Sequence, residues 1–452
     1  MKTLPIFRFL CIFSVLLVPR LAHAVPSFAR QSGLSCIACH SEYPILTEYG
    51  REFKLTGYTM STDQSKLPPL AVMVQPSFTQ TRKDQPDGAG PHFGKNSNLA
   101  ISQVSLFYSG RLFGPYAEDL FGGCPEVVTF MNKIGVFIQT TYDGVARQFL
   151  WDNVEIRYAD QGTIFGKPVT YGFYANNNPG LQDPWNTIPA WTFPFSGSGL
   201  APTPGAATLI EESLGQQVVG VGGYLFFNNS IYLDLAGYHT LDTGFQRAMG
   251  TSTDRENQIS GLAPYWRLAY TKSSGNQSFE VGLFGMEAGL YPNRVNSAGK
   301  DTLVDQGFDA QYQVSAGPHD VTALFSSIYE WEDWKASRKL GNTANSSGHL
   351  WSSKLTVDYL YDKTYGAAVG YFLVDGSHDE ALYADNPHGS PLSDGLVLQV
   401  NYLPFNKGEG PSFWPKSNVK LSVQYVIYNH FDGTSLGASD NNTLYLESWI
   451  AF

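Results

Sequence analysis

The sequence predicts an all-β protein whose main part is a transmembrane antiparallel β-barrel of about 16 strands. Three observations predict this fold. From about Leu70 to the end, apolar and polar residues alternate with a period of two and rarely with the 3.6-residue period of a helix. The chain begins with the features of a secretory signal and ends on an aromatic residue. Only 15% of the residues are charged, whereas 14% are aromatic and 45 are glycine, which suits a lipid-facing β protein better than a soluble one.

The first 24 residues predict a signal peptide. Lys2 and Arg8 give a basic start, residues 9–18 form a short apolar run, and residues 22–24 offer a small-residue cleavage site. We therefore expect residues 1–24 to be removed on export. No later stretch approaches the roughly 18 apolar residues that a membrane helix needs. The mature chain is expected to be held in the bacterial outer membrane by strands alone.

The barrel is expected over residues 70–452. In residues 419–428, Val419, Leu421 and Val423 alternate with polar neighbours, so one face of the strand is apolar and the other mostly polar. Segments of this kind are typical of membrane barrel strands, whose number is even in bacterial single-chain barrels. The predicted strands are 70–82, 99–112, 132–142, 150–159, 168–175, 215–227, 230–239, 263–271, 277–288, 307–314, 319–330, 351–361, 365–375, 395–404, 419–429 and 442–452.

The connections follow the rule that periplasmic turns of such barrels are short and outer loops are longer. With the N-terminal segment on the periplasmic side, the short turns include 228–229, 272–276, 315–318 and 362–364. Two periplasmic connections break the rule: 113–131, which carries Cys124, and 405–418. The outer loops are expected at 83–98, 176–214, 240–262, 289–306, 331–350 and 376–394.

The last ten residues, TLYLESWIAF, place Leu444, Leu446 and Ile450 on one face and end on Phe452. Bacterial outer-membrane barrels commonly end in this way. A soluble β-sandwich is the alternative. It fits less well, because sandwich turns come about every 8 to 12 residues and the candidate strands here are spaced about twice as far apart.

A different pattern stands in front of the barrel, in residues 25–69. Residues 35–44 read SCIACHSEYP, so Cys36 and Cys39 are two residues apart and His40 follows at once. In an exported protein, Cys-x-x-Cys-His indicates covalent attachment of one c-type haem, with both thiols bonded to the porphyrin and His40 as the proximal iron ligand. A zinc site would need a second ligand pair and a thioredoxin-like site a βαβ context, and the sequence has neither. A structural disulfide between Cys36 and Cys39 is the remaining alternative.

The distal iron ligand is expected to be Met73 or Met60. These are the methionines near enough in sequence to fold back over the haem segment, and a Met ligand opposite His raises the reduction potential. Each of them has the alternative role of an apolar packing residue. His92 is a third candidate, in a predicted outer loop.

The segment 25–69 is too short to bury a haem alone, because a domain of this size seldom builds a sufficient core. We therefore expect it to lie in or against the periplasmic opening of the barrel as a plug. Cys124 is expected to be an unpaired structural thiol, with intermolecular pairing as the alternative.

The stretch VPSFARQSGLSCIACHSEYPILTEYGREFKLTGY at 25–58, followed by an apolar barrel, resembles the fused cytochrome porins, and the likeness extends to YDGVARQFLWDNVEIRYAD at 142–160. These are outer-membrane monohaem c-type cytochromes, of which the best-known oxidise ferrous iron. The resemblance implies that Cys36, Cys39 and His40 hold the haem. It further implies that electrons pass from an extracellular donor, Fe(II) by best guess, to a periplasmic acceptor such as a soluble cytochrome. The insert 113–131 departs from the family pattern.

A solute porin with a structural or sensory haem is the alternative function. Its support is the loop 176–214, rich in proline and aromatic residues, because the third outer loop of many porins folds inward and narrows the pore. A solvated surface loop is the other interpretation. No catalytic residues are predicted, since nothing resembles a Ser-His-Asp arrangement or a phosphate loop. Whether the chain is an enzyme, as an Fe(II) oxidase would be, is left open.

The net charge of −11 argues against nucleic acid as a partner, because a polyanion would be repelled. Cations would not be repelled. Acidic residues in the predicted outer loops would attract them, or they form an ordinary solvated face. They are Asp301, Asp305, Glu330, Glu332, Asp333 and Asp379.

Overall fold

The computed structural model describes residues 27–60, 68–187, 196–249, 257–408, 410–411 and 417–452. The predicted signal peptide, residues 1–24, lies outside the described residues. Within them, no helix combines the length and the apolar character needed to cross a bilayer.

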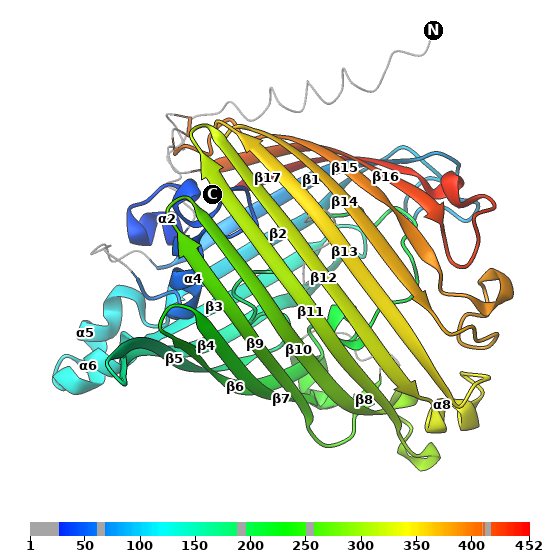
Figure 1. The fold of residues 1–452 in the computed structure, drawn as a ribbon, viewed down its shortest axis with the longest axis horizontal. Helices are drawn as coiled ribbons and strands as arrows, with labels where there is room; N and C mark the ends of the chain where they lie inside the picture. The colour runs from blue at the N-terminus through cyan, green and yellow to red at the C-terminus, as the bar shows by residue number, and fades with distance from the viewer. Residues whose placement is uncertain (1–26, 61–67, 188–195, 250–256, 409, 412–416) are drawn as a thin grey trace, which may run out of the picture.

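Sixteen long strands and one two-residue strand, β8, form a single antiparallel sheet in the described part of the chain (Figure 1). The first strand pairs with both the second and the last, so that Met73 lies opposite Ser105 on one side and Ala451 on the other. This double pairing closes the sheet into a barrel without a free edge. The strands are β1 (Leu70–Thr81), β2 (Asn98–Arg111), β3 (Ile134–Asp143), β4 (Gln148–Ile164), β5 (Lys167–Asn176), β6 (Val218–Phe227), β7 (Ile231–Thr240), β8 (Gln258–Ile259), β9 (Ala263–Ser274), β10 (Gln277–Tyr291), β11 (Asp301–Ala316), β12 (His319–Asp333), β13 (Ser347–Tyr361), β14 (Tyr365–Gly376), β15 (Ser393–Tyr402), β16 (Asn418–His430) and β17 (Thr443–Ala451).

The sixteen predicted strands are all present, and several extend further than the alternation indicates. Strand β11 begins at Asp301 rather than at residue 307, and β13 begins at Ser347 rather than at 351. These additional strand residues lie at the outer ends of the strands, where Asp301, Asp305 and Gly348 interrupt the apolar alternation. Backbone pairing continues there because ladder hydrogen bonds do not need an apolar outer face.

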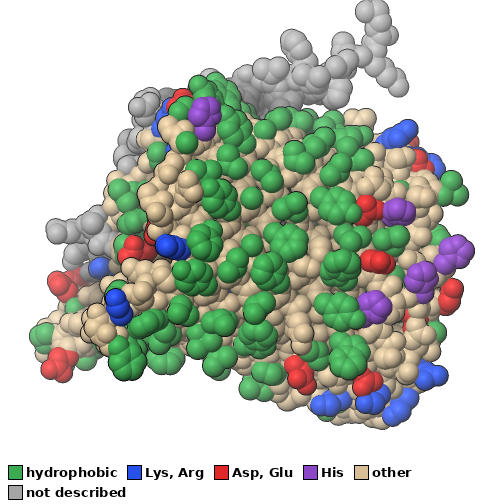
Figure 2. Space-filling model, viewed as in Figure 1, with side chains coloured by type: hydrophobic (Ala, Val, Ile, Leu, Met, Phe, Trp, Pro, Cys, Tyr) green, Lys and Arg blue, Asp and Glu red, His purple; other side chains and the backbone are tan. Residues whose placement is uncertain are grey.

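The two faces of the barrel wall differ as the alternation predicts. On β13, Trp351, Leu355 and Val357 point outward and are exposed, whereas Ser352 and Asp358 point inward and are buried. Figure 2 shows apolar side chains spread over the outer face of the strands, with charged side chains gathered toward the ends. An apolar outer face and a polar interior suit a wall that is surrounded by lipid.

The connections alternate in length as expected. Turns at 165–166, 228–230, 275–276, 317–318 and 362–364 join strands at the end of the barrel where the N-terminal segment lies. Two longer connections at this end are the predicted exceptions: 403–417, described except for 409 and 412–416, and 112–133. The connection 112–133 folds into a 3-10 turn (Gly114–Tyr116) and two short helices, α5 (Ala117–Phe121) and α6 (Pro125–Met131), which project from the same end (Figure 1). The longer loops and α8 (Lys335–Leu340) lie at the opposite end.

The N-terminal segment forms three short helices, α2 (Ser27–Ser32), α3 (Cys36–Cys39) and α4 (Glu48–Leu55), inside the barrel end (Figure 1). Thr47 caps α4, because its side-chain oxygen accepts a hydrogen bond from the Gly50 amide at 3.2 Å. Ile45, Phe53 and Leu55 are buried, and Leu55 packs against Tyr174 and Tyr224 of the barrel wall. The segment also contacts the loop that follows β5, because Lys54 donates to the Asp183 carbonyl.

Candidate functional site

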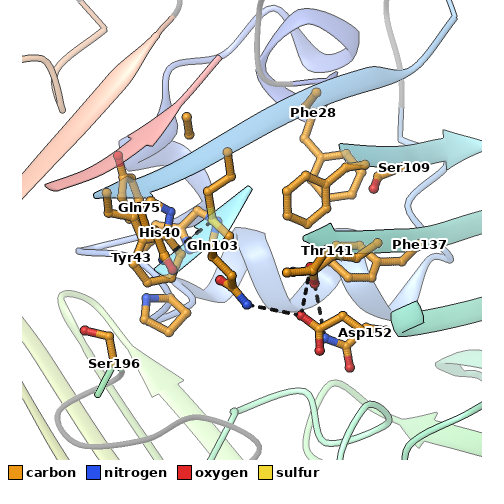
Figure 3. A pocket seen from close by; sticks show the side chains of 18 of the residues that line it. Phe28, His40, Tyr43, Gln75, Gln103, Ser109, Phe137, Thr141, Asp152 and Ser196 are labelled. Atoms are coloured by element: carbon orange, nitrogen blue, oxygen red, sulfur yellow. Dashed lines mark hydrogen bonds between the residues drawn. The ribbon is translucent and has the colours of Figure 1, made fainter. Parts of the chain in front are cut away.

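A cavity of about 650 Å³ lies between the N-terminal segment and one side of the barrel wall (Figure 3). This volume is in the range of pockets that enclose a drug-sized ligand. The wall side is formed mainly by β1–β4, β16 and β17. From the N-terminal segment, its lining includes Phe28, Cys36, Cys39, His40, Tyr43, Phe53 and Lys54.

Cys36 and Cys39 begin and end the one-turn helix α3. Neither forms a disulfide, both are half-buried, and both line the cavity. The turn is closed by backbone bonds, in which the His40 amide donates to the Cys36 carbonyl at 2.9 Å and the Thr47 amide donates to the Cys39 carbonyl at 2.9 Å. Burial, with a smaller effect from the Cys36 sulfur, raises the pKa of Cys39 to about 11. The two side chains face the same space, and Cys39 does so as a neutral thiol.

His40 follows α3 directly, in extended backbone. Its Nδ1 atom is buried and has no hydrogen-bond partner, and its ring stands edge-on to Tyr43 with centroids 6.1 Å apart. Burial lowers the pKa of His40 to about 4, partly offset by the nearby carbonyl groups of Pro44 and Ile45. The imidazole is thus neutral at pH 7, which is the form that ligates metals.

Among the three candidate distal ligands, only Met73 lines the cavity. It is 5% exposed on β1 and packs with Tyr43 and Trp449. Met60 is half-buried at the far end of the described N-terminal segment and is not part of the lining. His92 is exposed in the outer loop 82–97, at the opposite end of the barrel from His40. The structure therefore brings together Cys36, Cys39, His40 and Met73.

A cluster of aromatic rings forms one side of the cavity, and the sequence analysis did not identify it. Phe28 lies 4.8 Å from Phe53 and stacks on Tyr58 at 5.6 Å, and Tyr58 contacts Phe137 of β3 at 5.8 Å. Phe28, Phe53 and Tyr58 lie within the motif-bearing segment, but only the fold shows that they meet a ring from the wall. Aromatic rings in this arrangement offer a flat apolar surface.

A buried ion pair fixes the segment next to His40. Glu42 and Lys420 of β16 are 2.9 Å apart, with side chains 0% and 1% exposed. Asn401 of β15 donates to Glu42 at 2.5 Å, and Lys420 also donates to the Tyr43 carbonyl at 3.2 Å. Burial of a charge pair is tolerated only with such additional hydrogen bonds.

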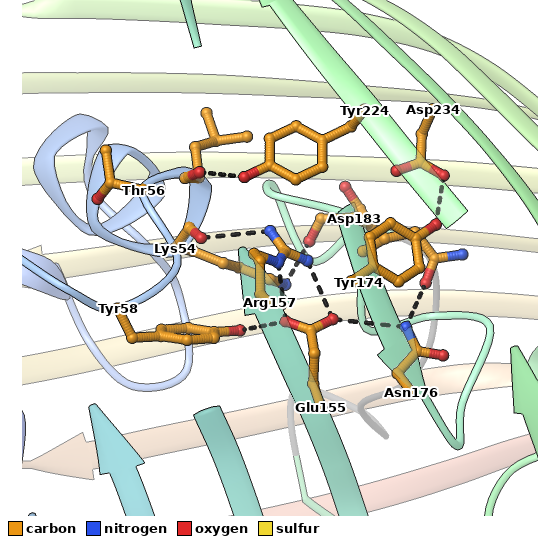
Figure 4. A network of polar contacts seen from close by, with 12 residues as sticks. Lys54, Thr56, Tyr58, Glu155, Arg157, Tyr174, Asn176, Asp183, Tyr224 and Asp234 are labelled. Atoms are coloured by element: carbon orange, nitrogen blue, oxygen red, sulfur yellow. Dashed lines mark hydrogen bonds and ion pairs between the residues drawn. The ribbon is translucent and has the colours of Figure 1, made fainter. Parts of the chain in front are cut away.

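Helix α4 is fixed on the other side of the lumen. Arg51 donates to Gln311 at 3.1 Å and to Gln313 at 2.7 Å, both on β11. Figure 4 shows the adjacent network, in which Tyr58 donates to Glu155 at 3.1 Å and Arg157 donates to both Glu155 and the Lys54 carbonyl. The Tyr224 hydroxyl bonds the Leu55 carbonyl. The segment is therefore attached to strands on several sides of the barrel.

The described parts of the loop 177–217, residues 177–187 and 196–217, fold into the lumen and are not a solvated surface loop. Gln182 and Asp183 are 0% exposed, and Asp183 lies 3.4 Å from Arg267 of β9. Ser196 donates to Glu447 of β17 at 2.8 Å, and the Leu209 amide donates to Glu330 of β12 at 2.7 Å. The loop also meets the N-terminal segment, because Lys54 donates to the Asp183 carbonyl at 2.7 Å.

The cavity runs from the N-terminal segment along the wall to the opposite end of the barrel. Its lining includes Asp143 and Val145, which lie at the turn 144–147 between β3 and β4. Strand β3 starts at Ile134 beside the N-terminal segment, so these residues are roughly 30 Å further along the strand. Polar side chains such as Gln103, Asp152 and Glu447 line the intervening stretch.

The acidic residues predicted to attract cations have a different role. Five of the six are buried, each 4% exposed or less: Asp301, Asp305, Glu330, Glu332 and Asp379. Four of these accept backbone hydrogen bonds: Asp301 at the start of α8, Asp305 and Glu330 from the inward loop, and Asp379 from the loop 341–346. Asp333 is partly exposed and pairs with Lys335 at 2.6 Å. The described residues contain no cluster of three or more His, Cys, Asp or Glu side chains arranged to hold a metal ion.

Cys124 is exposed between α5 and α6 at the periplasmic end, and it forms no disulfide. Its carbonyl accepts hydrogen bonds from the Val127 and Val128 amides at 2.9 and 3.1 Å at the start of α6. Its role as a structural thiol and its intermolecular pairing both stay predictions.

No family model matches this chain, and no curated protein matches it. Among solved structures, similar folds are OprB of Pseudomonas putida at high pH (11% identity, 85% of this chain and 93% of that chain, TM-score 0.48) and the outer-membrane channel DcaP of Acinetobacter baumannii (10%, 85% and 96%, 0.45). A third is an anion-selective porin from Comamonas acidovorans (10%, 84% and 98%, 0.42). We transfer no ligand or transport property from them at these identities. The resemblance to the fused cytochrome porins stays a prediction.

The architecture of the barrel supports a conclusion about the fold class. A closed antiparallel sheet with an apolar outer face, short turns at one end and a loop folded into the lumen is the architecture of bacterial outer-membrane porins. In the described part of the chain this barrel has sixteen long strands. The protein therefore has the fold of a bacterial outer-membrane β-barrel.

Proposed function

We propose that this barrel is a monohaem c-type cytochrome of the outer membrane, which moves electrons from an extracellular donor to a periplasmic acceptor. One observation carries the proposal: a single cavity is lined by two cysteines at Cys-x-x-Cys spacing that form no disulfide, by an imidazole with an unpartnered buried nitrogen, and by a methionine from the wall. In a solute porin without a haem these four side chains have no reason to meet.

The residues of the cavity fit a covalently bound porphyrin. Cys36 and Cys39 would attach it, and His40 and Met73 would ligate its iron. The aromatic rings of Phe28, Tyr58 and their neighbours would exclude water from its face. When bound, haem supplies a centre that accepts and releases one electron.

Lys54 is the only lysine or arginine among the described residues that line the cavity. It is 9% exposed. Its Nζ donates to the backbone carbonyl of Asp183 at 2.7 Å and to the side-chain amide oxygen of Asn186 at 3.4 Å. A buried ammonium held mainly by neutral oxygens is a favourable partner for an anionic group in the cavity. The carboxylates of a haem are such groups, so we assign Lys54 the role of their counter-charge.

This role predicts a pH effect. Burial, with smaller effects from charges nearby, lowers the pKa of Lys54 from 10.5 to about 8. Between these values the unfolded chain binds a proton that the native chain does not, so the free energy of unfolding rises with pH, by up to roughly 3 kcal/mol. We expect this rise in haem-free protein and its loss in Lys54→Met, measured by urea unfolding from pH 7.5 to 10.5. Haem-loaded protein should show a smaller rise, because an anionic partner restores the pKa; an equal rise contradicts the assignment.

Met73 as distal ligand predicts a change in potential. Met73→Ala is expected to lower the midpoint potential by roughly 100 mV, within the range of about 0.8 V that axial ligands span. The matched control is Met60→Ala, which should leave the potential unchanged because Met60 does not line the cavity. Redox titration of the visible spectrum measures both. A shift in the Met60 variant and none in the Met73 variant would reverse the assignment.

The donor in this proposal is extracellular, and Fe(II) is the best guess. The cavity supports a route for a small donor, because its lining reaches the turn 144–147 at the outer end. An acceptor on the other side would be a soluble periplasmic redox protein.

A solute porin with a structural or sensory haem is the second candidate function. The observation that favours it is the inward loop 177–217, which occupies the place of a pore-narrowing loop. The described part of the same loop contacts the N-terminal segment, so the two together fill more of the lumen than the loop alone.

Three measurements on the purified protein test the proposal. A visible spectrum with redox titration should show one haem; colourless protein would remove both candidates that contain haem. Stopped-flow mixing of oxidised protein with Fe(II) should give a reduced haem, and an unreduced haem removes iron oxidation only. In planar bilayers we expect a sealed barrel, whereas large ohmic steps would favour the porin.

A further inference from the structure

Among the periplasmic connections whose residues are all described, only 112–133 is not a tight turn. It is nevertheless folded. Ala117 and Val128 are 3% and 9% exposed, Phe113 packs edge-on against Phe121 at 5.2 Å, and Phe130 stacks on Tyr158 of β4 at 5.3 Å. A long, folded connection in place of a short turn indicates a function.

The outer surface of this helix pair is apolar and acidic. Leu120 and Phe130 are 61% and 50% exposed, and Tyr116 and Val127 are also exposed. Glu118, Asp119 and Glu126 stand among them, and residues 112–132 contain no Lys or Arg. The nearest base in sequence, Lys133, is already paired with Asp160 at 2.6 Å. The surface therefore combines a small apolar patch with a negative field. We call these seven residues the acidic helix pair surface.

The acidic helix pair surface is close to the cavity in the fold. The connection continues β2 and β3, whose Ser109 and Phe137 line the cavity. Arg111, at its start, donates to the Thr59 carbonyl of the N-terminal segment at 3.1 Å. Figure 1 shows α5 and α6 projecting from the barrel end that holds α2 and α4.

We infer that the acidic helix pair surface docks a soluble, basic redox protein of the periplasm, which takes one electron from the reduced centre in the cavity and is itself reduced. The inference rests on the proposed function. Charge complementarity selects this occupant, because transient electron-transfer contacts are small and are guided by opposite charge at their rim. A lipid surface fits less well, since helices that lie on membranes carry Lys and Arg on their polar face.

The test uses horse-heart cytochrome c as a basic soluble probe. The haem-loaded protein is reduced and mixed with oxidised probe, and the second-order rate is measured at low and high ionic strength. In the variant E118Q/D119N/E126Q we expect roughly a tenfold lower rate at low ionic strength, and little difference at high salt, where surface charges are screened. The matched control, D87N/E380Q/D385N, removes three exposed acids at the opposite end and should leave the rate unchanged.

Two further readouts keep the inference separate from the proposed function. Zinc-substituted cytochrome c transfers no electron from its ground state, so its binding, measured by fluorescence anisotropy, tests the surface even if the barrel holds no haem. A fluorophore on Cys124, which is exposed between the helices, should be quenched by the iron probe. If E118Q/D119N/E126Q binds zinc-substituted cytochrome c as tightly as D87N/E380Q/D385N does, the inference is overturned. A blue shift of the fluorophore in lipid nanodiscs without quenching by the probe would do the same, because it places the surface in the membrane.

Discussion

Replacing both Cys36 and Cys39 with alanine is expected to abolish covalent haem while leaving the barrel folded. The backbone of α3 is held by main-chain bonds that the substitution preserves. The N-terminal segment is held by Glu42, Arg51 and Tyr58, whose partners are the wall residues Lys420, Gln313 and Glu155. The readouts are haem-dependent peroxidase staining and the Soret band, both lost, and heat-dependent migration on a denaturing gel, retained.

Cys124→Ala is the control for this prediction. Its thiol lies outside the cavity, so staining and spectrum should match those of the unchanged protein. Covalent haem that survives in the double variant would show that another residue attaches it. Loss of haem in the Cys124 variant would mean that the helix pair takes part in attachment.

Arg267→Met is expected to destabilise the lumen by about 3 to 5 kcal/mol, the range for breaking a buried ion pair. Arg267 is 0% exposed and faces three buried carboxylates, Asp183 at 3.4 Å, Glu280 at 3.0 Å and Asp309 at 2.6 Å. Without it, these charges repel one another and lose their partner. Asp183 belongs to the inward loop, so we expect the loop to leave the wall. The midpoint of urea unfolding should fall, and conductance in planar bilayers should rise.

The combined variant R267M/E280Q/D309N tests the cause. It removes two of the uncompensated charges together with the cation and should recover most of the lost stability. Lys335→Met is the matched control, because Lys335 and Asp333 form an exposed pair with side chains 73% and 39% exposed, worth about 0 to 1 kcal/mol. If the Arg267→Met protein is as stable and conducts as poorly as the Lys335→Met control, Arg267 and its three carboxylates do not hold the inward loop.

The barrel was predictable from sequence because a wall between lipid and a polar lumen imposes a period of two on every strand. Residues 419–428 show that period, and Val423 is indeed exposed while Lys420 and Gln424 are buried. The outer extensions of β11 and β13 were not predictable in this way. Beyond the bilayer, side chains on the outer face need not be apolar. The alternation therefore disappears there, while the backbone hydrogen bonds between strands continue.

The site was predictable only where a covalent motif fixes it. Cys36, Cys39 and His40 are adjacent in sequence, and their spacing points to one cofactor. The choice between Met73 and Met60 needs the register of β1, which decides whether a side chain faces the lumen. The ion pair of Glu42 with Lys420 joins residues hundreds of positions apart, and no local pattern signals such a pair. The acids of the outer loops looked solvated in sequence because their backbone partners come from other loops.

The double pairing of β1 has a consequence for biogenesis. The cylinder is complete only when β17 joins β1, and β1 directly follows the segment that holds Cys36 and Cys39. Glu42, Arg51 and Tyr58 reach partners on strands made much later in synthesis. An attachment enzyme needs the Cys-x-x-Cys-His peptide accessible, and the finished wall surrounds it. For a haem held as proposed, cofactor loading is expected to precede closure of the seam, which would make maturation an ordered pathway.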